Sequence, residues 1–383
     1  MSVSTTYIRL NTRWSKRSKR IRRLKCHSLL RTLFTFTIFF GIIFFIICDF
    51  RLNIRIYWRD WITHEEFKHE NLSKCFDNIP NNSKPSIVYN DILTSLPLTY
   101  GWDCYDFAKS IKLKPGQPRE YIIYHSYWRA DLRPFGDKQI ATLKSFFATQ
   151  DETFSSLILW TNGNISTVPS LKLLLERYPN RFVIKHYNVM IESKETPMEN
   201  SPNLKLNDKL AYLDGDLIRL LVLYKYGGIW FDMDSLFVRD FSPLIEHEWL
   251  GQWDCFMPKG YPFNGAFMRF RKDSPYLCEF LSEMANGPVP SKSSIDWGGR
   301  LYYKVFRRLI QNGKKPFGMI PWCFTDSYLC NPSNSMPNAF DESKFDKERL
   351  LQVFAFHWHN QWDKKKGSLF RFLEQRNNEI LGF

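Results

Sequence analysis

The most regular pattern of apolar and polar positions lies between residues 210 and 240. Leucine and other apolar residues recur there at intervals of three and four, which predicts an amphipathic helix. Gly227 and Gly228 follow, and glycine commonly ends a helix because it accepts a positive φ at little cost. The apolar run 229–231 then predicts a short buried strand, which Asp232 and Asp234 follow directly.

The chain before this stretch alternates short apolar runs with helical patterns. The predicted strands and helices, in order, are residues 121–125 (strand), 137–148 (helix), 157–160 (strand), 171–178 (helix) and 182–184 (strand). This alternation predicts an α/β fold with a mostly parallel sheet flanked by helices. Since ligands of such sheets bind beyond the carboxyl ends of the strands, we expect the loops at Trp128 and Thr161 to share one rim with the turn at Asp232.

The two carboxylates of Asp232 and Asp234 suggest a metal site. Two residues apart, on a backbone that is just leaving a strand, both can reach one divalent ion, and hard oxygen ligands suit Mn²⁺ or Mg²⁺. The bare motif is not specific, because Asp214 and Asp216 form a second copy inside the predicted helix. The metal-site hypothesis therefore depends on the order of the elements: a helix, a Gly-Gly stop, an apolar strand and then the carboxylate pair.

Residues 215–219, followed by residues 223–234, resemble the sugar-binding region of DxD glycosyltransferases. The closest resemblance is to glycosyltransferase family 32 and its α-1,4-galactosyltransferase and α-1,6-mannosyltransferase relatives, over about residues 120–365. It implies a GT-A-type fold, a divalent metal, retention of the anomeric configuration and a nucleotide-sugar donor, either UDP-galactose or GDP-mannose. No residue stands out as a covalent nucleophile, so we expect a front-face displacement.

The resemblance also implies roles for residues of the central stretch. Asp232 and Asp234 are the expected catalytic pair, with Asp234 on the metal and Asp232 on the metal or on the ribose or sugar of the donor. Asp216 and Arg219 are expected to hold sugar hydroxyls. Their spacing of three residues on a helix is equally typical of a surface salt bridge, which remains the alternative.

Further site residues are expected outside this stretch. Tyr127 and Trp128 are expected to pack on the nucleotide base, with core aromatic residues as the alternative. Asn264 lies in a segment that resembles the galactosyltransferase branch, where it would be near the donor, although an Asn before a Gly is also typical of a turn. His357, with His359 as its alternate, is expected to complete the metal shell, because imidazole is a common Mn²⁺ ligand.

Three weaker predictions concern the remaining segments. Residues 187–208 are rich in Ser, Pro, Asn and Glu and predict a loop near the site that could act as a lid. Residues 321–324 resemble a Pro-rich strand of the family. Six of the eight cysteines follow residue 48, an even number that suits disulfides or buried thiols, and Cys323 with Cys330 is the expected local pair.

Charge is concentrated at the N-terminus. Of the net charge of +14, residues 1–31 contribute +10 and contain no acidic residue, so the body lacks the basic surface of a nucleic-acid binder. The uncharged residues 32–48 predict a transmembrane signal anchor of about 26 Å, with a cleaved signal peptide as the alternative. We therefore expect residues 1–31 to be a cytoplasmic tail, residues 49–118 a stem and lead-in, and residues 119–383 a lumenal catalytic domain.

These features together predict a single-pass type II enzyme of the Golgi (or ER) membrane. It would move a hexose to a hydroxyl of a glycan or glycolipid acceptor, and it would bind no nucleic acid. Sequons at Asn71, Asn81 and Asn164 agree with a lumenal body. The alternative is a lumenal sugar- or nucleotide-binding protein of the same fold that has lost catalysis.

Overall fold

The computed structural model describes residues 31–44, 69–77, 88–92, 103–205, 211–253, 262–291, 294–328 and 335–383. It divides into two compact units, Met1–Lys68 and His69–Phe383. In the first unit, residues 31–44 form a helix. Within the described ranges, no helix is both long enough and apolar enough to cross a membrane. The predicted tail up to residue 30 and the end of the predicted anchor, residues 45–48, lie outside the described residues.

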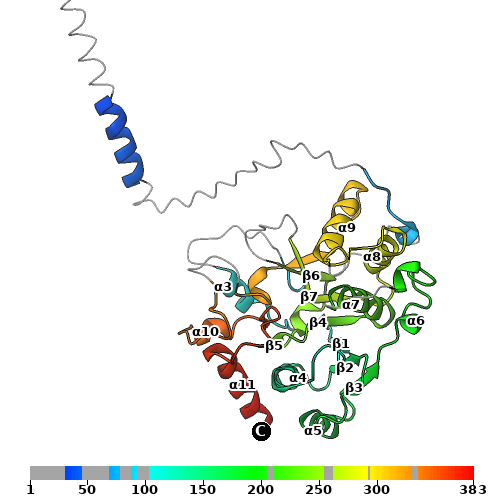
Figure 1. Ribbon diagram of the computed structural model, residues 1–383. Helices are drawn as coiled ribbons and strands as arrows, with labels where there is room; N and C mark the ends of the chain where they lie inside the picture. Colours follow the sequence, from blue (N-terminus) through cyan, green and yellow to red (C-terminus); the bar gives the residue numbers. More distant parts are fainter. Residues whose placement is uncertain are drawn as a thin grey trace, which may run out of the picture. The chain divides into compact units, whose positions relative to one another are not determined.

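The second unit is built on a seven-stranded sheet with the order β3-β2-β1-β4-β7-β6-β8 (Figure 1). The strands are β1 (Ile122–Trp128), β2 (Ser155–Thr161), β3 (Phe182–His186), β4 (Gly228–Phe231), β6 (Trp249–Gln252), β7 (Phe263–Phe270) and β8 (Gly318–Ile320). Only β7 pairs antiparallel with its two neighbours, and the other pairs are parallel. A second sheet pairs β5 (Ser235–Phe237) with β9 (Ala355–His357).

Helices cover both faces of the main sheet. The described helices of the second unit are α3 (Cys104–Ser110), α4 (Asp137–Thr149), α5 (Pro169–Arg177), α6 (Val189–Glu192), α7 (Tyr212–Tyr226), α8 (Pro275–Asn286), α9 (Gly299–Gln311), α10 (Lys347–Leu350) and α11 (Ser368–Leu381). Short 3-10 turns form η1 (Lys74–Phe76), η2 (Pro202–Lys205), η3 (Ser242–Leu244) and η4 (Trp322–Phe324). The predicted α/β fold with a mostly parallel, helix-flanked sheet is therefore confirmed.

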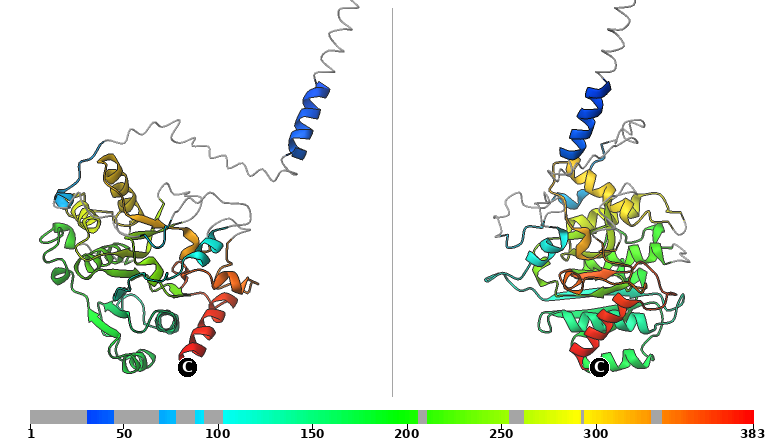
Figure 2. Two further views of the ribbon diagram at one scale, coloured as in Figure 1. Left: turned by 180° about the vertical axis from the view of Figure 1, so that it is seen from behind. Right: turned by 90° about the vertical axis from the view of Figure 1, so that its left-hand side faces the viewer.

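The side chains of β4 show how the two faces are filled. Ile229 and Phe231 belong to the apolar cluster that contains residues of α4 and α11, and α11 packs against α4 (Figure 2). Trp230, between them, belongs to the cluster formed with α7, α8 and α9. Alternate residues of a strand point to opposite faces, so this short apolar run is buried on both sides and fixes the position of the residues that follow it.

The transition from α7 to β4 occurs at the two predicted glycines. Gly227 has a φ of 67° and Gly228 a φ of 110°, both in the region that favours glycine. A Cβ atom on Gly228 would lie 2.0 Å from the carbonyl oxygen of Ile123 in β1. The parallel pairing of β1 with β4 therefore requires glycine at this position.

Two predictions for the segment around residue 323 were wrong. Residues 321–324 form no strand, and Trp322–Phe324 is the 3-10 turn η4. Cys323 is bonded to Cys104, 219 residues away, and Cys330 lies outside the described residues. Spacing along the chain could not predict a pair that depends on α3 packing against η4. A second disulfide joins Cys75 to Cys278 and ties η1 to α8.

The predicted loop 187–208 contains local structure. Val189–Glu192 forms α6, and Pro202–Lys205 forms η2. Residues 206–208 lie outside the described residues. The composition-based prediction missed these two short elements, because a single helical turn leaves no periodic pattern in a polar sequence.

His125 of β1 is fully buried between two hydrogen-bond partners. Its Nδ1 accepts from the Trp160 indole N–H at 3.2 Å, so the neutral ring carries its proton on Nε2, which donates to the carbonyl oxygen of Gly227 at 3.0 Å. Burial is the main reason why the pKa of His125 is lowered to about 3.

Lowering the pH should therefore destabilise the fold through His125. The unfolded ring has a pKa of about 6.5, so between that value and about 3 only the unfolded chain takes up this proton. The free energy of unfolding should fall by about 1.4 kcal/mol per pH unit in this window and be unaffected by His125 above it. Denaturant unfolding of the full chain at pH 7 and pH 5 measures this, with His125→Gln as the control that keeps both hydrogen bonds. Equal pH dependence in the two proteins would contradict the prediction.

Candidate functional site

A cavity of about 520 Å³ lies where β1, β4 and the start of α7 meet. The predicted site residues among those lining it are Tyr127, Trp128, Asp216, Arg219, Asp232 and Asp234. The segment after β9 adds Asn360 and Trp362 to the wall. The two carboxylates of the motif thus border a cavity at the carboxyl end of β4, on the rim where the sequence placed them.

Asp232 is held by two donors of different elements. The indole N–H of Trp230 donates to it at 2.7 Å, and Arg219 Nη2 lies 3.2 Å from its Oδ1. About a quarter of the side chain, 26%, is exposed toward the cavity that it lines. Burial and the nearby charge of Asp234 raise the pKa of Asp232, although Arg219 opposes this shift. The carboxylate is therefore fixed in position while one side faces the cavity.

Asp234 is more deeply buried and has different partners. Its Oδ2 accepts from the backbone N–H of Asn360 at 2.6 Å and lies 3.2 Å from Nε2 of His357. Burial alone would raise the pKa of Asp234, but the charge and hydrogen bond of His357 outweigh it and lower the pKa. Asp234 is thus the more firmly ionised member of the pair.

Arg219 links Asp232 to the preceding helix. Its guanidinium lies 3.3 Å from Asp216 within α7 and 3.2 Å from Asp232 at the end of β4. The side chains of Arg219 and Asp216 are only 12% and 9% exposed, so they are not the surface salt bridge that spacing alone allowed. A Cβ atom on Gly265 would lie 2.2 Å from Arg219 Nη1, so the guanidinium needs a glycine beside it.

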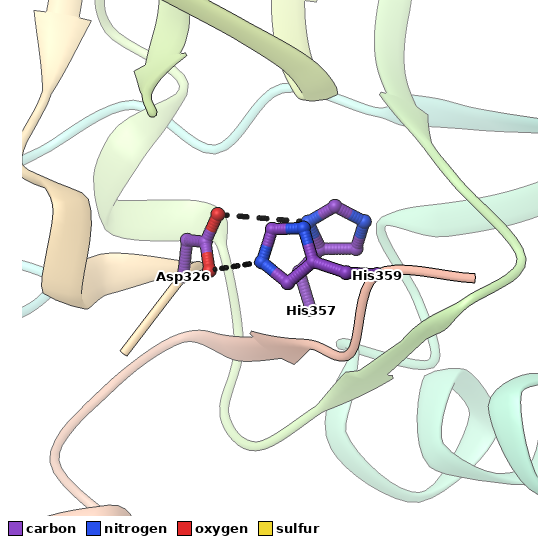
Figure 3. A group of neighbouring side chains, drawn as sticks. All are labelled: Asp326, His357 and His359. Carbon is purple, nitrogen blue, oxygen red and sulfur yellow. Dashed lines mark hydrogen bonds and ion pairs between the residues drawn. The ribbon is translucent and has the colours of Figure 1, made fainter. Parts of the chain in front are cut away.

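The two histidines share one carboxylate, as Figure 3 shows. His359 Nε2 lies 2.7 Å from Oδ1 of Asp326, and His357 Nδ1 lies 3.7 Å from its Oδ2. The ring centroids are 4.1 Å apart, so the two side chains lie next to each other. Burial opposes ionisation of Asp326, but the charge of His359 and the bonds to both histidines lower its pKa to about 2.

The residues present fit a divalent cation. One ligand atom from each of Asp232, Asp234 and His357 lies within 4.8 Å of the others. Two carboxylates with one imidazole are a donor set that suits Mn²⁺ better than a soft metal. His359 does not belong to this group and clusters instead with Asp326 and the other ring nitrogen of His357.

Tyr127 and Trp128 are the last residues of β1, not of the loop after it as predicted. Trp128 is buried against Trp362, with ring centroids 5.0 Å apart, and yet it lines the cavity. Tyr127 packs against Tyr187, which follows β3, with centroids 5.5 Å apart. Tyr127 and Arg129 also border a second cavity of about 360 Å³ at the ends of β1, β2 and β3.

Asn264 lies within β7, so it is not the turn residue that its Asn-Gly sequence allowed. Its amide nitrogen donates to Asp326 at 3.1 Å, and its oxygen accepts from the N–H of Ala266 at 2.9 Å. Asn264 does not line the cavity beside Asp232. It contacts the site through Asp326.

Sequence reasoning missed Asp326 and Asn360. Asp326 follows η4 in a segment without periodic pattern, and Asn360 acts through its backbone N–H, which carries no residue-specific signal. His359 and Asn360 both have positive φ, at 54° and 56°, which turns the chain so that one reaches Asp326 and the other Asp234. The adjacent polar residues of 357–360 were the available cue.

Comparison with known proteins identifies the region around the motif. Residues 136–250 match the family model described as the glycosyltransferase sugar-binding region containing the DXD motif. An uncharacterized protein of Arabidopsis thaliana is 41% identical over 143 residues, which is 37% of this chain and 21% of that protein. The match therefore spans about a fifth of the length of that relative.

Solved structures of glycosyltransferases align with part of the chain. The PaToxG glycosyltransferase is 17% identical and aligns over 51% of this chain and 80% of its own, with a TM-score of 0.32. Mouse xyloside xylosyltransferase 1 is 12% identical over 63% of this chain and 99% of its own, with a TM-score of 0.38. The assignment rests on the family model, whose range includes Asp216, Arg219, Asp232 and Asp234. Residues 136–250 thus match the glycosyltransferase sugar-binding region containing the DXD motif, in agreement with the predicted resemblance.

Proposed function

We propose that the chain is a metal-dependent glycosyltransferase of GT-A type that moves a hexose from a nucleotide-sugar to a hydroxyl of a glycan or glycolipid with retention of configuration. One observation carries the proposal: Asp232 and Asp234 border a cavity directly after a buried strand, and Nε2 of His357 lies 3.2 Å from Asp234. The match of residues 136–250 to the sugar-binding region supports the reaction class.

Asp234, Asp232 and His357 would hold the cation. Mn²⁺ (or Mg²⁺), when bound, acts as a Lewis acid on the diphosphate of the donor and neutralises charge on the leaving nucleotide. The buried contacts of Asp234 with Asn360 and His357 keep its carboxylate in one orientation. Such preorganised charge stabilises the transition state because no reorganisation is needed when the glycosidic bond breaks.

We assign the sugar and the nucleoside of the donor to different cavities. Arg219 and Asp216 are buried beside Asp232, and we place the sugar hydroxyls there because these groups line the same cavity. We place the nucleoside at the second cavity, where the aromatic rings of Tyr127 and Tyr187 meet. The diphosphate would then pass Arg129, which borders both cavities. The acceptor hydroxyl would attack the anomeric carbon of the sugar from the same face from which the nucleotide leaves.

The donor and the compartment are further parts of the proposal. We propose UDP-galactose or GDP-mannose as donor, on the basis of the family resemblance. Two disulfides support a lumenal position of the second unit, because such bonds persist in oxidising compartments. Asn71 and Asn164 of the described sequons are both exposed, as glycosylation requires. The basic N-terminus and residues 32–48 support a single-pass type II anchor in the Golgi (or ER) membrane.

Removing the metal is the direct test. Transfer by the full-length chain in detergent should be lost in EDTA and return with added Mn²⁺, because the proposed cation neutralises the charge of the donor diphosphate. A thermal-shift screen with Mn²⁺ and a panel of UDP- and GDP-sugars should raise the unfolding temperature only with the native donor class. Unchanged transfer in EDTA would refute the metal-dependent reaction. Donor binding without transfer to any acceptor would favour the alternative of an inactive binding protein.

A further inference from the structure

A lysine of α4 contacts the loop that follows β9. The ammonium of Lys138 donates to three backbone carbonyl oxygens, those of Gln361 at 3.0 Å, Trp362 at 2.5 Å and Lys364 at 2.5 Å. A lysine ammonium has three N–H donors, so this one loop can occupy all of them. Because the acceptors are backbone atoms, the contact fixes the course of the chain and not only one side chain.

The position of Lys138 is unusual for a lysine. It is the second residue of α4, where the helix dipole disfavours a positive charge, and its side chain is half-buried. The ammonium also lies over two aromatic rings, 4.5 Å from the centroid of Phe340 and 5.7 Å from that of Trp358. Carbonyl oxygens and ring faces both attract a cation, so they offset the unfavourable position. Lys138 therefore occupies a built cation site and is not a solvent-facing lysine.

The loop has a backbone that needs such support. His359 and Asn360 have successive positive φ values of 54° and 56°. This conformation costs free energy for residues other than glycine and persists only where the surroundings hold it. The His359 ring is held by Asp326, with Nε2 2.7 Å from Oδ1. The carbonyls bound by Lys138 follow the turn directly, so the chain is held on that side as well.

The same loop forms part of the site. The backbone N–H of Asn360 donates to Asp234 Oδ2 at 2.6 Å, and Asn360 and Trp362 both line the cavity of about 520 Å³. The Trp362 indole N–H donates to Asn360 Oδ1 at 3.0 Å. A shift of the carbonyls would therefore move a wall of the cavity together with the N–H that orients Asp234.

We infer that Lys138 is a positioning residue, whose ammonium holds residues 361–364 so that Asn360 stays on Asp234 and Trp362 stays in the cavity wall. Lys138 does not line that cavity, so it acts through the loop and not on the substrate. The inference rests on the proposed function, because the loop borders the cavity in which we place the donor sugar.

The first experiment compares Lys138→Ala with Lys144→Ala in the full-length chain in detergent. Lys144 is a matched control, because it is half-buried on the same helix and its ammonium lies 3.9 Å from a ring centroid, that of Phe383, while it donates to Asn378. Hydrogen exchange of peptides covering residues 358–366 should become at least about 10-fold faster in Lys138→Ala only, since bonds to a charged donor are lost.

Donor kinetics decide whether the loop matters for the site. We expect kcat/KM for the donor to fall by about 10²-fold in Lys138→Ala, as a small misplacement of site groups can cause, and to stay unchanged in Lys144→Ala. A merely structural lysine would lower the unfolding temperature in both variants and leave kcat/KM unchanged in both.

Chemical rescue tests the ammonium itself. Propylammonium is the fragment that Lys138→Ala removes, and it should restore both slow exchange of the loop and kcat/KM. Tetramethylammonium has the same charge without an N–H donor and should restore neither. Equal effects of the two salts would overturn the inference.

The outcomes separate this inference from the proposed function. Wild-type exchange or wild-type kcat/KM in Lys138→Ala would overturn the positioning role and leave a metal-dependent transferase intact. A wild type that transfers no sugar, or transfers it equally in EDTA, would refute the proposed function and the positioning role with it, whatever the loop exchange. If Lys138→Ala does not fold, Lys138→Gln keeps most of the stem and replaces the charged donor with a neutral amide. Wild-type exchange of residues 358–366 in that variant would overturn the inference.

Discussion

Replacing Asp234 with Asn should lower kcat/KM for transfer by about 10³-fold, equivalent to about 4 kcal/mol of transition-state stabilisation. The substitution keeps the volume of the side chain and removes its charge. The lost carboxylate is the one that accepts from the Asn360 N–H and lies beside His357, so its orientation is fixed before the donor binds. Asn is a weak ligand for Mn²⁺, and the charge on the leaving nucleotide would be poorly neutralised.

Initial rates of the full-length chain with varied donor and Mn²⁺ measure this effect. Asp273→Asn is the control, because it makes the same chemical change at an exposed position away from the cavity. Thermal unfolding in the absence of metal shows whether the Asp234 variant is folded. A folded Asp234→Asn protein with wild-type kcat/KM would end the proposed mechanism.

The second large effect concerns stability. Arg219→Leu should lower the free energy of unfolding by about 3–5 kcal/mol, because it leaves two carboxylates in a mostly buried site without their shared cation. Asp216 and Asp232 are both within 3.3 Å of the guanidinium, which joins α7 to the end of β4. Denaturant unfolding at pH 7 provides the measurement.

The chain contains a matched comparison for Arg219. Arg300, in the first turn of α9, pairs with Asp296 in the turn before that helix at 2.9 Å, but the Arg300 side chain is 62% exposed. Arg300→Leu removes an Arg–Asp ion pair that is exposed to water and should cost less than about 0.5 kcal/mol. The double variant Arg219→Leu/Asp216→Asn should be more stable than Arg219→Leu, since one uncompensated charge is gone. Similar losses for Arg219→Leu and Arg300→Leu would show that burial does not govern the Arg219 pair.

The parts of the fold that follow from local pattern were predicted correctly. The helix of α7, its glycine stop and the strand β4 all depend on residues within one short stretch, so periodicity and backbone preference determine them. The same holds for the alternation of strands and helices from β1 to β3. Asp232 and Asp234 border the cavity as expected, because a residue that directly follows a buried strand has little freedom of position.

The parts that depend on distant contacts could not be predicted in this way. Asp326 is recognisable only once β9 and η4 bring it beside His357, and no local pattern encodes that approach. The pairing of Cys323 with Cys104 depends on tertiary packing in the same way. Asn264 illustrates the reverse error, because its sequence is typical of a turn and yet it is a strand residue whose amide serves Asp326.

The Asn360 contact also sets an order of events during biosynthesis. The ribosome adds Asn360 126 residues after Asp234, and elongation proceeds at about 5–20 residues per second. For about 6 to 25 seconds, the nascent polypeptide therefore contains Asp234 but not yet the Asn360 N–H that binds it. Until His357 and Asn360 have been added, the growing chain holds only part of the proposed cation site.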